Sequence, residues 1–424
     1  MSTWLSRPSS SRSCVVGWIL APVIFVVATQ LWGGPTYGDA NVSVFAAWAL
    51  AHGHLACAYP AAGVTGYAPT APVYPLLTGA LTAILRVGHT VAFPSSEVLG
   101  PHCQHAVLAM TSWALHSHAW TTTLRLGYLS WIVLLAGSVT LLRSFDLGRS
   151  VREIVLVMLL ALTPSVSMCL WQYFHPQDLL AMGLILAALA AARRQYWSRS
   201  GALFAVALLS QQFSLLLFIP LCLIAPRERR ARFLGAALAT GLFVVVPLTL
   251  ATSGRSVASS LLGTGFTSWT QSLLVETGLR SAPLFTLSRV LPIVMALVVA
   301  WWLSNRLAEK IFEPVPLLCL LALSLSGRLI FEINLWGYYF MAVSVALILL
   351  DLVSGYLRLT LLAWLSLVSF AAFHGLSNGS RSAIPLAAWQ VVLVGGAVAL
   401  ATTPLVRYLT DADTSVPLRA SSMR

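Results

Sequence analysis

Residues 14–32 read CVVGWILAPVIFVVATQLW, an apolar run that follows Arg7 and Arg12. A helix needs about 20 mostly apolar residues to cross the hydrocarbon core of a membrane, so this run predicts the first crossing. The run resembles a secretory signal peptide in its position and in the charges before it. It is too long for the usual apolar core of such a peptide, and no Ala-x-Ala cleavage site follows closely, which favours an uncleaved signal anchor.

Runs of the same kind recur along the chain, in which 58% of the 424 residues are hydrophobic and only 9% are charged. This composition excludes an ordinary soluble domain. It predicts an all-α polytopic membrane protein that forms a single integral membrane domain over residues 1–424. About ten full spans are expected, at 14–32, 124–143, 153–171, 177–192, 232–252, 288–304, 313–331, 338–353, 359–374 and 385–406.

The net charge of +12 comes from arginines that are concentrated between the apolar runs. Excess Lys and Arg in cytoplasmic loops orients membrane proteins, so the charge indicates topology and we expect no nucleic-acid partner. Both termini, and a tail at 407–424, are placed on the cytoplasmic side. The basic clusters that fix this orientation lie at 143–152, 193–199, 227–232 and 306–310.

Two apolar segments do not fit this orientation as simple crossings. Segment 73–92 contains Arg86 and His89, which are unfavourable at mid-membrane, and we expect an interfacial or re-entrant helix on the outer face. Segment 201–225 has basic clusters on both flanks. A hairpin of two half-helices that bends at residues 210–213 keeps both clusters inside, and irregular backbone at that depth must face protein or a wet cavity.

The outer side holds a long first segment, 33–123, which we expect to carry interfacial helices, and a second loop at about 253–287. All nine histidines fall on this side. The acidic residues on this side are few, and the other acids lie at cytoplasmic ends or tails. The outward acids are Asp39, Glu97, Asp178, Glu276 and Glu332.

Asp39 lies in the sequence WGGPTYGDA, residues 32–40, just after the first predicted span. An aspartate before a helix can act as an N-cap. A carboxylate at the membrane surface can also act as a general base that takes the proton from an acceptor hydroxyl. The two roles are compatible.

A second outward motif reads FHPQD at residues 174–178, where one span ends and the next begins. Asp178 and Pro176 could simply start a helix. His175 and Asp178, three residues apart, could also converge on one pocket. At the hairpin bend, Gln211 and Gln212 are candidates for the polar wall of a lipid-phosphate site.

A third outward motif reads GRLIFEINLWGYY at residues 327–339. Arg328 could extend to the membrane surface, and the aromatic residues could form an interfacial belt. Alternatively, Arg328 offers forked donors to a lipid phosphate and stabilises its departure. In that interpretation Glu332 orients Arg328.

The histidine pairs His102/His105 and His116/His118 have the spacing of metal ligands. No third ligand type is fixed by the sequence, so surface or pocket histidines are the preferred interpretation and we predict neither a metal site nor a cofactor. No phosphate-binding loop or dinucleotide fingerprint occurs. Cys57 and Cys103 both fall outside, where a disulfide between them would restrain the long first segment.

Three of these features together resemble the GT-C glycosyltransferases. They are the outward Asp39, the long outer segment with Tyr67-Ala68-Pro69 and Tyr74-Pro75, and Arg328 followed by Tyr338 and Tyr339. More narrowly, the chain is similar to the actinobacterial family that uses polyprenyl-phosphate sugars and includes mannosyl- and arabinofuranosyltransferases of the cell envelope. Relatives often carry Lys-Pro in the hairpin, where this chain has SQQF at 210–213.

The resemblance implies a GT-C-like bundle in the cell membrane with its active site on the extracytoplasmic face. It implies a polyprenyl-phosphate sugar donor, a glycolipid or polysaccharide acceptor, inversion at the anomeric carbon and no metal requirement. By position, Asp39 would be the base, and Arg328, Tyr338 and Tyr339 would lie near the donor.

Two other classes of function stay open. A lipid or glycan transporter places ionisable groups along a membrane pathway and often has two similar halves, but the acids here lie at helix ends and no internal repeat is visible. A non-catalytic relative of the GT-C enzymes is the second, because the hairpin lysine is missing.

Overall fold

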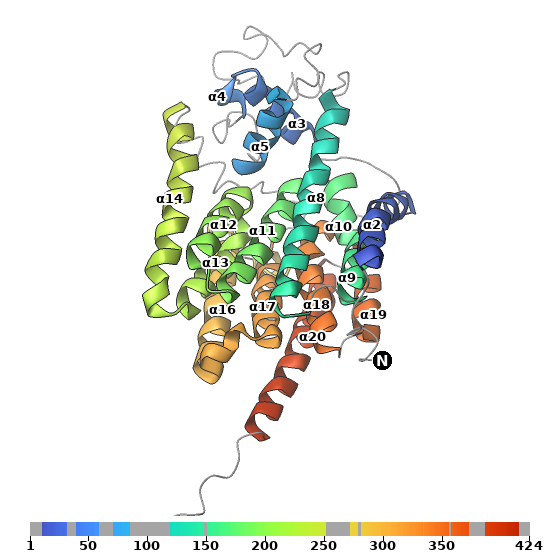
Figure 1. Ribbon diagram of the computed structural model, residues 1–424, viewed down its shortest axis with the longest axis vertical. Coiled ribbons are helices and arrows are strands. Elements are labelled where there is room, and N and C mark those ends of the chain that lie inside the picture. The colour runs from blue at the N-terminus through green and yellow to red at the C-terminus, as the bar shows by residue number, and fades with distance from the viewer. Residues whose placement is uncertain are drawn as a thin grey trace, which may run out of the picture. The chain divides into compact units, whose positions relative to one another are not determined.

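The computed structural model describes residues 11–31, 40–58, 71–84, 119–147, 151–251, 272–278, 281–333, 335–355, 358–372 and 386–414. Every regular element in these ranges is a helix, as the sequence predicts, and no strand occurs among the described residues (Figure 1). Asp39 lies outside the described ranges. So do Arg86, His89, Cys103 and the histidine pairs of the long first segment.

Among the described residues, seven helices are long and apolar enough to cross a membrane, and each overlaps a predicted span. The all-helical, multi-pass character expected from the sequence is therefore supported. The helices are Arg125–Ser144 within α8 (Ala119–Ser144), α11 (Pro176–Arg193), α14 (Arg227–Ala251), Thr286–Phe312 from α16 (Ser281–Leu307) and η3 (Ala308–Phe312), α17 (Pro314–Phe331), Gly337–Ser354 from η4 (Gly337–Phe340) and α18 (Met341–Ser354), and Leu386–Asp411 within α20 (Leu386–Thr414).

An eighth crossing, predicted at 153–171, is divided into α9 (Val151–Leu162) and α10 (Pro164–Trp171), which meet at an angle of 52°. Thr163 between them has an extended backbone. Proline lacks an N–H and disfavours helical geometry in the preceding residue, so Pro164 explains the break.

The remaining predicted crossings correspond to shorter apolar helices among the described residues. The described apolar part of α2 (Ser11–Leu31) covers Val15–Ala28, and α19 covers Arg358–Ala371. Ten full spans therefore stay a prediction. In the outer segment, α5 (Val73–Ile84) has 12 residues and a length of about 18 Å, too short to cross a hydrocarbon core of about 30 Å.

The chain forms two compact units. The N-terminal unit comprises residues 8–218 and 225–268, and the C-terminal unit comprises 1–7, 219–224 and 269–424. The boundary passes through α13 (Leu215–Ile224), which follows α12 (Trp197–Ser210) and the short η1 (Gln212–Ser214). The single membrane domain expected from the sequence stays a prediction.

In the N-terminal unit, α8 and α11 lie side by side and run in the same direction. Gly127 of α8 approaches Phe174 just before α11, and Gly137 lies against Gly183 of α11. A side chain on either Gly137 or Gly183 would overlap backbone of the facing helix. Small residues let apolar helices approach closely in a membrane, so these glycines set the distance between the two helices.

The first helix, α2, packs against α9 of the same unit. The Glu153 side chain of α9 is buried, accepts hydrogen bonds from Arg143 at 2.7 and 3.0 Å, and accepts a third at 3.4 Å from the Trp18 indole of α2. Phe25 of α2 stacks on Trp131 with ring centroids 4.7 Å apart. These contacts make α2 part of the N-terminal unit.

The C-terminal unit is built around α17, which packs against α16, α18 and α20. Its residues 316–327 are all buried, as expected of a central helix. Helix α20 also contacts α19, where the Trp364 indole donates to the backbone oxygen of Leu393 at 2.8 Å. A Cβ on Gly396 would lie 2.8 Å from the Trp364 ring, so this glycine makes room for the contact.

Candidate functional site

One polar cluster lies where α17 ends, in the C-terminal unit. Arg328 is in the last turn of α17, and its Nε donates to Glu332 Oε2 at 3.1 Å. The two residues are four apart, the spacing at which side chains of opposite charge meet along a helix. Their side chains are 18% and 11% exposed, so this ion pair lies largely inside the protein.

The next turn brings both predicted tyrosines beside this pair. Helix η4 contains Tyr338 and Tyr339, whose ring centroids are 4.6 Å apart at 80°. The guanidinium carbon of Arg328 lies 4.5 Å from the centroid of the Tyr339 ring, within range of a cation–π contact. Arg328 is thus held by a carboxylate and by an aromatic face.

A second arginine, which the sequence did not single out, lies at this cluster. Arg289 of α16 is within electrostatic range of Glu332, Arg328 and Tyr339. Two guanidiniums around one carboxylate leave a net positive charge. An arginine inside an apolar run is a functional signal in itself, and that signal could have identified Arg289 within the predicted span 288–304.

Gln390 of α20 forms hydrogen bonds with the backbone at the end of α17, next to Arg328. Its amide nitrogen donates to the backbone oxygens of Leu329 at 2.5 Å and Ile330 at 2.8 Å, and its amide oxygen accepts from the Leu273 N–H at 2.9 Å. The last carbonyls of a helix have no partner within it, so this fully buried side chain completes the end of α17. We call Arg289, Arg328, Glu332, Tyr338, Tyr339 and Gln390 the α17 cluster.

A second polar cluster lies in the N-terminal unit, where α11 begins and α12 ends. Gln211 donates from its amide nitrogen to Asp178 Oδ1, and its amide oxygen accepts from the backbone N–H of Gln212 at 3.0 Å. Asp178 is only 2% exposed. The sequence predicts the motif at 174–178 and the bend at 210–213 as separate candidates. In the structure Asp178 and Gln211, which are 33 residues apart in the chain, are in direct contact.

The turn before α11 has an unusual backbone. Phe174 has a φ of +60°, which a bulky residue rarely adopts, and the N–H of the next residue, His175, donates to the Cys169 backbone oxygen at 2.5 Å. The amide nitrogen of Gln177 lies 3.0 Å from His175 Nδ1. The Gln177 amide oxygen is buried and has no hydrogen-bond partner among the described residues. We call His175, Gln177, Asp178, Gln211 and Gln212 the α11 cluster.

Within the N-terminal unit, the α11 cluster and the basic segments lie at opposite ends. Arg143 pairs with Glu153, the Arg193 guanidinium lies 4.8 Å from the Phe145 ring, and Arg199 and Arg232 line one pocket. These contacts gather the basic segments at the end where α8 and α11 finish. The α11 cluster lies at the end where α11 starts, one helix length away.

The short helices α3 (Ala40–Ala51), α4 (Leu55–Ala58) and α5 lie beside the start of α8 (Figure 1). Cys57 of α4 is disulfide-bonded; Cys103, its predicted partner, lies outside the described residues.

Tyr74 of α5 is buried, and its hydroxyl has no hydrogen-bond partner among the described residues. Burial raises the pKa of this hydroxyl above its ordinary value because the ionised form is poorly solvated.

Within the described part of the chain, no three His, Cys, Asp or Glu side chains are grouped as a metal site would require. His52 and His54 are exposed, and the His52 ring stacks on Trp48. The predicted site residues that the described ranges contain lie in the α17 and α11 clusters. No protein-family model matches the chain, and no curated protein is significantly similar to it.

Proposed function

We propose that the protein is a membrane glycosyltransferase of GT-C type that transfers mannose or arabinofuranose from a polyprenyl-phosphate donor. The acceptor is a glycolipid or polysaccharide at the outer face of the cell membrane, and Asp39 is the base. The observation that carries the proposal is the α17 cluster, a net positive site where Arg328 at the end of α17 and Arg289 of α16 share the carboxylate of Glu332.

The chemistry of the α17 cluster suits a phosphate that leaves from a sugar. As the bond between the anomeric carbon and the phosphate oxygen breaks, negative charge grows on that oxygen. Arg328 is already oriented by Glu332 and Tyr339, and Arg289 adds a second guanidinium nearby. Preoriented donors where charge develops are an effective means of catalysis, and guanidiniums match phosphate geometry.

The proposed reaction is a single displacement with inversion. The acceptor hydroxyl oxygen forms a bond to the anomeric carbon, its proton passes to the Asp39 carboxylate, and the phosphate departs with the electron pair of the broken bond. One base is enough, because phosphate leaves without a separate acid. This differs from retaining glycosidases, which use two carboxyl groups, one of them as the nucleophile.

Two independent features of the N-terminal unit support an outer-face site. The arginine-rich end has the composition of a cytoplasmic face. The disulfide at Cys57 requires an oxidising compartment, and α4 lies at the opposite end of the unit (Figure 1). This orientation directs the α11 cluster outward.

The helix break at Gln211 supports a re-entrant hairpin at 201–225 and, with it, the ten-span arrangement. Phe204 and Phe218 lie equally far along the chain on either side of Gln211, and their ring centroids are 6.0 Å apart, so the chain reverses there. In the proposal, a polar wall contacts the sugar or the phosphate of the donor, and it consists of Gln211, Gln212, His175 and Asp178. The wall takes the place of the Lys-Pro found in the family that the chain resembles.

The decisive experiment is a membrane assay with radiolabelled polyprenyl-phosphate mannose and polyprenyl-phosphate arabinofuranose as separate donors. Wild-type membranes should transfer one sugar to lipid or polysaccharide, and Asp39→Asn and Arg328→Gln should each abolish transfer at equal protein levels. Glu276→Gln is the matched control, because it also removes an outward acid but lies outside both clusters. Near-normal turnover by Asp39→Asn would contradict the mechanism.

A further inference from the structure

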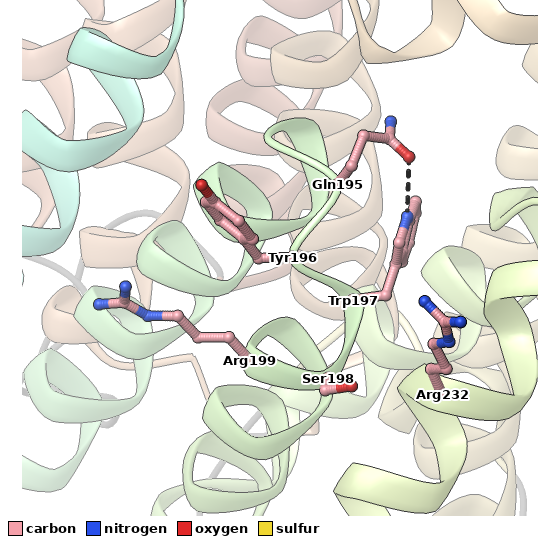
Figure 2. A pocket seen from close by; sticks show the side chains of 6 residues that line it. All are labelled: Gln195, Tyr196, Trp197, Ser198, Arg199 and Arg232. Atoms are coloured by element: carbon pink, nitrogen blue, oxygen red, sulfur yellow. Dashed lines mark hydrogen bonds between the residues drawn. The ribbon is translucent and has the colours of Figure 1, made fainter.

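A pocket of about 410 Å³ lies at the arginine-rich end of the N-terminal unit. Its walls come from the turn before α12, the first turn of α12 and the start of α14. Figure 2 shows Arg232 of α14 next to Trp197, with Arg199 on the other side of the first turn of α12. The residues that line it are Gln195, Tyr196, Trp197, Ser198, Arg199 and Arg232.

The walls of this pocket are held in place by buried packing. Trp197 is 2% exposed, its indole N–H donates to the Gln195 amide oxygen at 3.0 Å, and its ring contacts Phe233 of α14. A Cβ on Gly201 of α12 would overlap the backbone oxygen of Phe233. The starts of α12 and α14 are therefore in close contact, and the pocket between them is preformed.

The charges around the pocket are opposite to those that helix starts favour. The first turn of a helix carries a partial positive charge and unbonded N–H groups, so acids stabilise it and cations do not. Here the first turn of α12 contains Arg199, and the first two turns of α14 contain four arginines with Glu228 as their one acid. Those arginines are Arg227, Arg229, Arg230 and Arg232.

We propose that this pocket binds a phosphate group. Its donors are the Arg232 guanidinium, the Ser198 hydroxyl and the first N–H groups of α12, a combination typical of phosphate recognition. A bound phosphate relieves the repulsion between the cations and the two helix starts. Basic pockets between transmembrane helices on the cytoplasmic side bind anionic lipid headgroups, and a soluble phosphate uses the same donors.

This site does not depend on the proposed sugar transfer, since none of its residues belongs to the α17 or α11 clusters. The full-length protein, purified in a neutral detergent with phosphatidylcholine, is titrated with phosphatidic acid in one arm and with inorganic phosphate in the other. The melting temperature is recorded, with chloride at equal ionic strength as the reference. A saturable rise with phosphatidic acid alone identifies a lipid headgroup, and a rise with both ligands or with inorganic phosphate alone identifies a soluble phosphate.

Variants separate the pocket from general attraction to basic protein. Arg232→Gln should weaken the apparent affinity about tenfold, the loss expected for one charge-assisted contact. Arg227→Gln removes the same charge from the same helix start but lies outside the pocket, and it should bind as the wild type does. Ser198→Asp places an acid at the start of α12, so it should raise the melting temperature without ligand and lose the response to it.

The proposal fails under either of two results. If neither ligand raises the melting temperature of the wild type, the pocket does not bind phosphate. If Arg227→Gln and Arg232→Gln weaken binding equally, the attraction comes from the charge of the whole segment.

Discussion

Gln211 donates a hydrogen bond to the carboxylate of Asp178 and so joins the residue that follows α12 to the first turn of α11. The carboxylate is 2% exposed, and a buried charge is stable only when it is paired or hydrogen-bonded. The bond therefore fixes where the chain reverses, and it makes the α11 cluster a structural unit whatever chemistry it performs.

Gln211→Leu should lower the free energy of unfolding by about 1–3 kcal/mol, because it leaves a buried acceptor without that donor. Asp178→Asn in the same chain should recover much of the loss, since the charge that needed the donor is gone. Thermal melting of the two single variants and the double variant in detergent measures this coupling. Strictly additive effects would show that the two side chains do not interact.

Gly137→Ala and Gly183→Ala should each destabilise the protein by about 1–3 kcal/mol, because the added methyl group forces α8 and α11 apart. Gly235→Ala and Gly241→Ala on α14 are matched controls, since a Cβ at either position meets nothing within 4 Å. Those two changes should be neutral or stabilising by about 0.5–1 kcal/mol, because alanine favours the helix. Equal losses at all four positions would contradict the close contact.

Gln390→Met should lower the stability of the C-terminal unit by about 1–3 kcal/mol, because α17 loses partners for its last carbonyls. If the α17 cluster binds the donor, the same variant should also raise the apparent KM for the polyprenyl-phosphate sugar. Thr403→Val is the control on the same helix, because its hydroxyl is exposed and bonds only within α20. A Gln390→Met protein with unchanged melting and unchanged KM would show that this side chain positions nothing.

The two ends of the N-terminal unit should be reachable from opposite sides of the membrane. Tyr196 lies at the arginine-rich end, and its side chain is 60% exposed. A membrane-impermeant maleimide should therefore label a Tyr196→Cys variant only in opened cells. His54→Cys, also exposed and next to α4, should be labelled in intact cells. Labelling in the reverse pattern would invert the topology.

Cys57 should be recovered as a disulfide-linked peptide when the protein is digested without reductant, and the predicted partner peptide contains Cys103. Cys169 and Cys319 are buried thiols, so they should react with maleimide only after unfolding. Mass spectrometry of the alkylated peptides distinguishes these cases. Quantitative alkylation of Cys57 in the native, unreduced protein would exclude the bond.

The sequence predicted local features well. Seven predicted spans overlap helices that can cross a membrane, because twenty apolar residues in a row allow little else. Arg328 and Glu332 were paired correctly because four residues make one turn of a helix. The break near 210–213 also appears, at Gln211.

Contacts between distant segments were not predictable from the sequence. Nothing near Gln390 indicates that its amide reaches the end of α17, about 60 residues away. Arg289 was counted as part of an ordinary span, although its charge marked it as unusual. Pro164 alone does not predict the break, because proline is often tolerated within membrane helices.

The glycine contact between α8 and α11 also bears on the membrane in which the protein resides. Two helices whose backbones touch cannot slide past one another, so the spacing between the arginine-rich end and the α11 cluster is set by the 18 residues of α11. That length is about 27 Å, close to the hydrocarbon thickness of a thin bilayer. We expect α11, held against α8 at this length, to favour thin regions of the bilayer or to thin the lipid around it, so the chain length of the lipids should affect the stability of the protein in the membrane.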